Sequence, residues 1–188
     1  DYLRKCVGPK GSVSTTPMDS TDPRTMPAAL TLWALALQGT DPVTVGLIAE
    51  NLRLGQEPTS HGWGVSFGAP ANPSNTAQVL IALRWAGIAR DAVWVREAAD
   101  YLLSAQRGDG SWRNSSDEWF TAATPHLPYR CSNFGTAWGL TAMLWFPEGP
   151  YADSSWRASE RLIAAQLPGG AWQFDAYDPK EHVWCSAQ

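Results

Sequence analysis

Two adjacent acids, Asp117 and Glu118, stand in a long polar stretch, residues 113–132, that we expect to form the longest loop of the chain. A carboxylic acid can donate or accept a proton in a reaction, so these two residues are the candidate catalytic acids by location. A loop of this length in a compact domain is typical of functional, partly helical or mobile segments. The alternative is that both carboxylates are hydrated on an ordinary exposed loop.

The element that leads into this loop is residues 98–112, AADYLLSAQRGDGSW. Apolar residues at helical spacing predict a short amphipathic helix, which Gly108 and Gly110 then end and turn. Gln106 and Trp112 stand six residues apart across that turn. We expect the amide to cap backbone groups at the helix end and the indole to close over the turn.

The same pattern recurs along the chain, which indicates a repeat protein. Residues 158–172, ASERLIAAQLPGGAW, keep the glutamine and the tryptophan six residues apart. Residues 49–63, AENLRLGQEPTSHGW, have one additional turn residue. The first thirteen residues form a degenerate copy, in which Val7 and Val13 replace the glutamine and the tryptophan.

A second kind of segment separates the copies and is apolar on almost every side, which predicts buried helices. These segments are residues 27–39, 75–87 and 135–146, and residues 186–188 match the start of another one. Each unit is therefore an outer, half-exposed helix, a Gly/Trp turn, a polar loop and an inner, buried helix. We expect Asp41, Asp91 and either Asp153 or Ser154 to cap outer helices, and Ser74 or Asn75 to cap the second inner helix.

The Gln-x(3)-Gly-x-Trp copies and the matched inner helices resemble the QW repeats of the terpenoid cyclase and protein prenyltransferase superfamily, which includes squalene–hopene cyclase. The resemblance covers nearly the whole chain and implies an all-α fold, an α/α toroid or partial toroid of repeated outer and inner helix pairs around a cavity. We expect residues 1–188 to form a single domain of this kind. About three and a half helix pairs are present where the family has about six, so we expect an excerpt of a larger chain or part of a shared barrel.

A cavity of this family would be lined by aromatic side chains, whose faces stabilise a carbocation through cation–π attraction. The candidate substrate-binding residues are Trp119, Phe134, Trp138 and Trp184, on or beside inner helices and their loops. The alternative for each ring is that it only fills the core between helices. Trp63, Trp112 and Trp172 belong to the turns and are expected to be structural.

The cyclases of this family carry an Asp-x-Asp-Asp motif directly before a Thr-Ala inner-helix start. The matching positions here are residues 24–27, 72–75, 132–135 and 182–185, and none of them is acidic. The resemblance therefore implies that the proton donor is absent from this stretch. Either the acid lies on further repeats, or the protein is not a cyclase that begins by protonation.

No metal site or cofactor is predicted. Asp178, His182 and Cys185 are the nearest imitation of the zinc ligands of the prenyltransferase branch, but their order and spacing differ from that pattern. An Asp-rich DDxxD motif and a thioester motif are also absent from the sequence. The cysteines, with no CxxC spacing, favour neither a disulfide framework nor a Cys-rich zinc site.

Composition sets wider limits. The 188 residues are 44% hydrophobic and 17% charged, which is typical of a globular chain with a core. A net charge of −4 disfavours nucleic acid as a partner, and no apolar run reaches the roughly 18 residues of a membrane span. We expect a cytoplasmic protein, with peripheral membrane association left open.

Two functions stay open on these observations. The first is a terpenoid-cyclase-like domain that binds an isoprenoid chain in an aromatic-lined cavity, which would make it an isomerase or lyase if active. The second is a catalytically silent toroid that acts as a protein-interaction or scaffold domain in a larger assembly. In either case, other domains or chains that complete the barrel are the expected partners.

Overall fold

The computed structural model describes residues 2–14, 24–39, 41–113 and 132–172, and within these ranges it is helical without any strand. Its elements are α1 (Tyr2–Lys5), α2 (Thr25–Leu37), α3 (Pro42–Leu54), α4 (Pro73–Trp85), α5 (Val93–Ser104), α7 (Ser132–Met143) and α8 (Pro150–Ala165).

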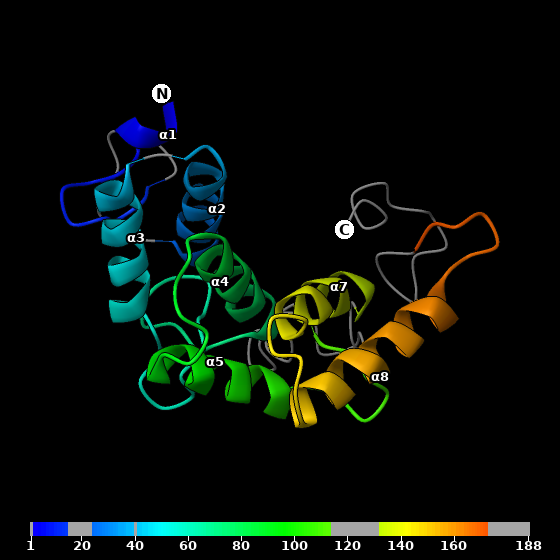
Figure 1. The fold of residues 1–188 in the computed structure, drawn as a ribbon. Helices are drawn as coiled ribbons and strands as arrows, with labels where there is room; N and C mark the ends of the chain where they lie inside the picture. Colours follow the sequence, from blue (N-terminus) through cyan, green and yellow to red (C-terminus); the bar gives the residue numbers. More distant parts are fainter. Residues whose placement is uncertain (1, 15–23, 40, 114–131, 173–188) are drawn as a thin grey trace.

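Figure 1 shows these helices in two layers. The inner layer holds α2, α4 and α7 with α4 in the middle, and α3, α5 and α8 bound it on the outside. Each inner helix packs against the outer helix that follows it along the chain, α2 on α3, α4 on α5 and α7 on α8. The helix pairs therefore form an arc, and the predicted all-α fold, an α/α toroid or part of one, is confirmed.

The two layers differ in burial because their sequences differ in hydrophobic pattern. α4 is enclosed over most of its length, and only its last two residues are exposed. α5 instead buries one stripe at the spacing i, i+3, i+4 and i+7, made of Val95, Ala98, Ala99 and Leu102. The apolar inner segments are thus held between neighbours, and the outer helices cover them with one face.

The indoles of the Gly/Trp turns are hydrogen-bonded to the outer helices that precede them. Trp63, Trp112 and Trp172 donate their Nε1–H groups to the carbonyl oxygens of Leu52, Leu102 and Leu162 at 2.8, 2.7 and 2.7 Å. Each acceptor lies in the last turn of its helix, where intrahelical donors run out. The indole is therefore the group that caps the end of the outer helix.

The glutamines act differently from the expectation, because they join one repeat to the next. The Nε2 of Gln106 donates to the carbonyl oxygen of Gly110 in its own turn at 3.0 Å and to that of Ser154 in α8 at 2.9 Å. The Nε2 of Gln56 donates likewise to the carbonyl oxygens of His61 at 2.6 Å and Trp94, in α5, at 2.9 Å. The prediction that the amide caps its own helix was wrong.

Two helix starts follow an amide or carboxylate cap. The carboxylate of Asp41 accepts from the backbone N–H groups two and three residues on, at 3.0 and 3.1 Å, so this predicted cap of α3 is confirmed. The side chain of Asn72 accepts from the N–H of Asn75 at 2.9 Å and caps α4. The prediction of Ser74 or Asn75 was wrong, because Pro73 already occupies the first helical position.

The other two predicted caps were also wrong. α5 has Ala92 at its N-cap without a side-chain hydrogen bond, one residue after the predicted Asp91. α8 begins at Pro150, so Asp153 and Ser154 lie inside the helix and Gly149 stands at the N-cap. Neither helix has a side-chain cap: α5 begins with the apolar Val93, and α8 begins with Pro150, whose ring suits the first helical position.

Candidate functional site: an aromatic inner face

A hydrogen bond from each turn fixes the register of the inner helices. The backbone N–H of Trp63 donates to Oγ1 of Thr76 at 2.9 Å, and that of Trp112 donates to Oγ1 of Thr136 at 3.1 Å. Both threonines are fully buried near the starts of α4 and α7. They therefore occupy the same position in two repeats, and Ala28 matches that position in α2 by sequence.

An α-helix turns by about 100° per residue, so a side chain two positions after Ala28, Thr76 or Thr136 lies about 200° around the helix from it. That side chain therefore points away from the turns and the outer layer. We call the resulting surface the inner face. Its residues recur at helical spacing: Met26, Leu30, Trp33 and Leu37 in α2; Ser74, Gln78, Ile81 and Trp85 in α4; Phe134, Trp138, Thr141 and Trp145 in and just after α7.

Three aromatic rings meet on the inner face. The ring centroids of Trp33 and Trp138 lie 6.3 Å apart with their planes at 78°, and those of Phe134 and Trp138 lie 6.1 Å apart at 82°. Edge-to-face contacts of this kind are the favoured geometry of aromatic pairs. Since α4 lies between α2 and α7, the two indoles meet over α4, where Gln78 and Ile81 are buried.

The structure brings together two of the predicted substrate-binding residues. Phe134 and Trp138 are neighbours on α7, and both are partly buried. The candidate acids Asp117 and Glu118, and the aromatic candidates Trp119 and Trp184, lie outside the described residues.

By sequence, Trp33 is one of the inner-helix tryptophans that could face a cavity, but it is not among the four candidate substrate-binding residues, and Gln78 is not singled out. A signal for both was present. Gln78 stands two residues after Thr76, as Trp138 stands two residues after Thr136. Trp33 lies one helical turn beyond the matching position in α2, so counting from each inner-helix start would have found all three on one face.

Three of the described carboxyl groups are held as carboxylates by hydrogen bonds. Ser60 donates from its hydroxyl and backbone N–H to Glu57, and these bonds lower the pKa of that carboxyl to about 2. Hydrogen bonds from Thr44 lower the pKa of Asp41, and one from Arg53 lowers that of Glu50. These three acids are ionised at neutral pH and serve as hydrogen-bond acceptors in turns and on outer helices.

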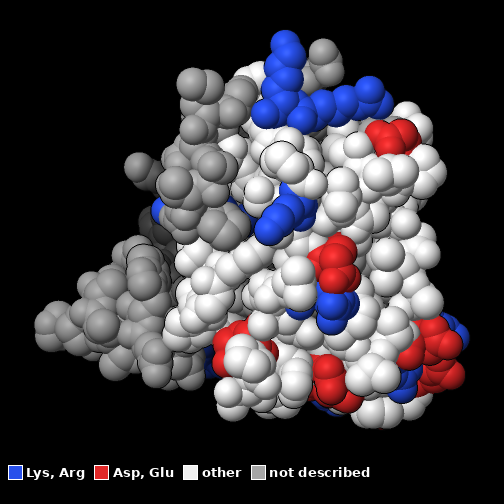
Figure 2. Space-filling model, turned by 90° about the vertical axis from the view of Figure 1, so that its left-hand side faces the viewer, with Lys and Arg blue, Asp and Glu red and all other residues white. Residues whose placement is uncertain are grey.

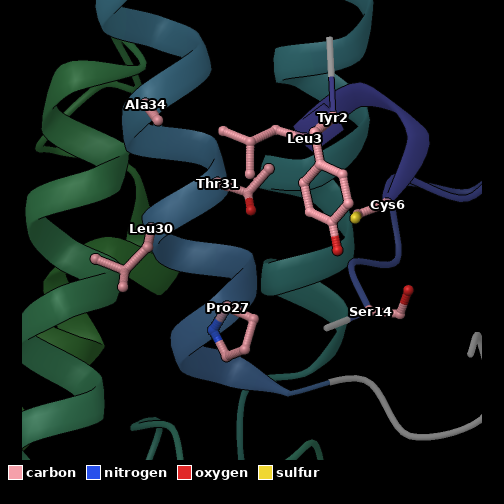
Figure 3. Close-up of a pocket in the computed structure, with 8 residues that line it drawn as sticks. All are labelled: Tyr2, Leu3, Cys6, Ser14, Pro27, Leu30, Thr31 and Ala34. Carbon is pink, nitrogen blue, oxygen red and sulfur yellow. The ribbon is translucent and has the colours of Figure 1, made fainter. Parts of the chain in front are cut away.

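A hollow of about 440 Å³ lies between α1 and α2. Figure 3 shows its apolar lining, which includes Leu3, Leu30 and Ala34 and also the sulfur of Cys6. Its lining residues include no Asp, Glu, His, Lys or Arg, and the titratable groups among them are the phenol of Tyr2 and the thiol of Cys6, whose hydrogen bond raises the pKa of Tyr2. The inner face, with its clustered rings, is the better candidate site.

Charged side chains of both signs lie on the face of the molecule drawn in Figure 2. On the face drawn in Figure 2, blue Lys and Arg side chains gather at one end, and elsewhere they alternate with red Asp and Glu on a mostly uncharged surface. Within the part of the chain that the structure describes, no three His, Cys, Asp or Glu residues are grouped to hold a metal ion. None of the described helices has the length and hydropathy of a membrane span.

Comparison with known proteins gives two kinds of relationship. No family model matches the chain. In sequence, 121 residues are 32% identical to squalene–hopene cyclase of Bradyrhizobium diazoefficiens, a match that covers 61% of this chain and 16% of that protein. The chain thus corresponds to a small part of this relative's length.

In structure, the chain is similar to a type II terpene cyclase from Scytonema, solved in complex with its substrate geranylgeranyl dihydroxybenzoate. The TM-score is 0.65 at 19% identity, over 91% of this chain and 48% of that one. A possible member of the GH105 family from Salmonella enterica gives a TM-score of 0.61 at 12% identity, over 98% of this chain and 57% of that one. At these identities the likeness is one of fold, and the chain spans about half of each neighbour.

The sequence match and the fold agree with the repeats and with the two-layered arc. Together they confirm the resemblance on which the interpretation of the sequence depends: this chain is related to the terpenoid cyclase-like superfamily.

Proposed function

We propose that this chain is part of a terpenoid-cyclase-like ring whose inner face binds an isoprenoid chain. The observation that carries the proposal is the contact between the rings of Trp33 and Trp138 across α4. Phe134 packs against Trp138 on α7 and continues this aromatic surface along that helix. Rings on two inner helices thereby form one continuous aromatic surface. Such a surface suits a branched apolar chain and attracts a carbocation that develops along it.

The proton that starts such a reaction must come from elsewhere. The inner-helix starts at residues 24–27, 72–75 and 132–135 carry no acid. We propose that the donor is either an acid on repeats outside this stretch or one of Asp117 and Glu118, the candidate acids within it. No cofactor enters this proposal, and the cytoplasmic location stays a prediction.

The missing acid also supports a second candidate function, a toroid that binds a partner without catalysis. Exposed apolar side chains on the outer layer favour it, since Trp156 and Ile163 of α8 are 67% and 71% exposed. Both functions share the fold, so binding of an isoprenoid decides between them.

The test is to measure binding of squalene and of a prenyl diphosphate to the full chain by quenching of tryptophan fluorescence, and then to search for cyclised products by mass spectrometry. We expect Trp138→Leu to weaken binding by about three- to tenfold, as the loss of an aromatic contact implies. The matched control, Trp156→Leu on the exposed face of α8, is expected to leave binding unchanged. If the wild-type chain binds neither compound, the isoprenoid proposal falls and the scaffold function remains.

A further inference from the structure

The inner layer has an open edge at α2. α4 has an inner helix on each side, α2 on one and α7 on the other. Within the described residues, the neighbouring inner helix of α2 is α4, and Figure 1 shows α2 at the end of the layer near α1. The hollow of about 440 Å³ lies at this end, and one of its walls is a single face of α2 that carries Pro27, Leu30, Thr31 and Ala34.

The same face is closed in the two inner helices that follow. Ala34, Ala82 and Ala142 stand at one matched position, six residues after the residues that match at the inner-helix starts. Ala82 and Ala142 are 0% and 1% exposed, whereas Ala34 is only half-buried. Leu30 is 40% exposed, and Gln78 at its place on α4 is 4% exposed. In the part of the chain that the structure describes, α2 therefore lacks the cover that this face has in α4.

The element that covers this face of α4 is the preceding inner helix. Thr31 lies on the hollow side of α2, and Ala29, two residues earlier and about 200° around the helix, lies on the opposite side. Ala29 is fully buried, and α4 is the inner helix packed against α2. α2 therefore turns the side of Ala29 to the following inner helix and its hollow side to the place of a preceding one.

The first turn shows which part of a repeat α1 represents. A Cβ added at Gly11 would clash with the backbone of Leu47 in α3, just as one added at Gly110 would clash with Arg157 in α8. α1 and its turn thus stand where an outer helix and its Gly/Trp turn stand in later repeats, in which the inner helix comes first along the chain. An inner helix paired with α1 would pack on both α1 and α2, and Figure 3 shows that these two helices line the hollow.

We propose that the hollow receives one further inner helix, parallel to α2 and immediately before α1 in the same polypeptide, an inference that rests on the ring of the proposed function. The lining contains no Asp, Glu, His, Lys or Arg. The side of the further helix that meets α2 is therefore apolar, because a charge buried there would have no partner. The contact needs no isoprenoid, so it is the same in a catalytic ring and in a scaffold.

The experiment compares this chain with the protein extended at its N-terminus by the residues that its gene encodes before Asp1. Ala34→Glu places a carboxylate in the proposed contact. We expect it to lower the midpoint of thermal unfolding of the extended protein by about 5 to 10 °C, because a buried unpaired charge is destabilising, and that of this chain by less than about 2 °C. Ala82→Glu is the matched control, at a position that α2 covers in both proteins, and is expected to destabilise both.

A labelling measurement does not depend on a buried charge. Leu30→Cys presents a thiol to a maleimide at the rim of the hollow, and peptide mass spectrometry separates residue 30 from the native cysteines. We expect this thiol to react about tenfold more slowly in the extended protein, because the further helix covers it. Leu54→Cys, on the exposed end of α3, is the control and is expected to react at the same rate in both proteins.

Equal rates at position 30, an equal effect of Ala34→Glu in the two proteins, or a gene without an apolar helical segment before Asp1 would overturn this inference. Protection of Leu30→Cys in this chain by a second copy, seen as a dimer in sedimentation, would also overturn it. Quenching of tryptophan fluorescence by squalene, measured on both proteins, tests the isoprenoid separately. Absence of quenching would overturn the proposed ligand and leave the further helix in place.

Discussion

Trp112 donates its indole N–H to the carbonyl oxygen of Leu102, ten residues earlier in the chain, at 2.7 Å. The indole is fully buried, so it closes the end of α5 and fills the core with the same side chain. Trp63 and Trp172 make the equivalent bond in their own repeats. This repeated contact sets the direction in which the chain leaves each outer helix for the inner layer.

The first prediction concerns this bond. Trp112→Phe keeps an aromatic ring but leaves the carbonyl of Leu102 without its donor, so we expect a loss of about 2 to 3 kcal/mol in the free energy of unfolding. Urea unfolding followed by circular dichroism measures it. Trp156→Phe, on an exposed side chain of α8, is the control and is expected to cost less than about 0.5 kcal/mol. Equal effects of the two substitutions would contradict this role of the indole.

The second prediction concerns the amide that joins two repeats. Gln106→Leu removes the bonds from Nε2 to the carbonyl oxygens of Gly110 and Ser154, so we expect about 1 to 2 kcal/mol of destabilisation. Hydrogen exchange is expected to rise at the start of α8 more than in α3. Gln166→Leu is the comparison, because among the described residues its amide donates only to Gly170. A larger effect at Gln166 would contradict the proposed bridge between repeats.

The third prediction concerns the backbone of the same turn. Gly110 has φ of +84°, and a Cβ built there would lie 2.5 Å from the carbonyl oxygen of Arg157 in α8. We therefore expect Gly110→Ala to cost about 2 kcal/mol or more. Gly108→Ala, where no atom lies within 4 Å of the added carbon, is expected to be nearly neutral in the same unfolding measurement. A neutral result at both glycines would show that the close approach of α8 is not required.

The fourth prediction concerns acid stability. Hydrogen bonds from Ser60 and Thr59 hold the pKa of Glu57 at about 2, below its ordinary value of 4.5. A carboxyl group with a lowered pKa in the folded state adds stability above its unfolded pKa, and that stability is lost as the pH falls toward 2.

Because Glu57 is near the surface, we expect its contribution to be at most about 1 kcal/mol. The measurement is the midpoint of thermal unfolding between pH 5 and pH 2. Glu57→Gln is expected to lower the midpoint at pH 5 and to reduce the fall on acidification. An unchanged pH dependence in this variant would contradict the assignment.

The order of outer helices, turns and inner helices could be predicted from the sequence, because hydrophobic spacing and the Gly/Trp turns are local signals. Helix starts were harder. The rule that favours polar caps identified Asp41 correctly but failed at α8, where Pro150 at the first helical position begins the helix before Asp153.

One turn position shows why local rules have limits. Gly110 and Gly170 adopt positive φ, and His61 takes the equivalent place with φ of 60° in the turn that has an additional residue. Its imidazole lies 3.5 Å from a carboxylate oxygen of Glu97 on the neighbouring outer helix α5. The glycine pattern of the other two turns does not predict a histidine with positive φ here. The contact of His61 with Glu97 joins two repeats, so it cannot be inferred from the sequence of the turn alone.

The candidate site could be predicted only in part. Both Phe134 and Trp138 could be named as candidates from the sequence, and their spacing of four residues is the local signal that puts them on one helix face. The contact of Trp138 with Trp33 joins residues more than a hundred positions apart and depends on how α2, α4 and α7 pack. The burial of Gln78 follows from the same packing, so no local pattern could indicate that its carbonyl oxygen is unpaired.

The most direct test of the central claim is to map where an isoprenoid lies on this chain. A C20 isoprenoid that carries a photoactivatable diazirine would be bound to the full chain, irradiated, and located by peptide mass spectrometry. The account predicts labels on the inner face, near Trp33, Gln78 and Trp138, that excess unlabelled geranylgeraniol removes. Labels confined to the outer helices, or to Leu3, Cys6 and Ala34 in the hollow between α1 and α2, would contradict it.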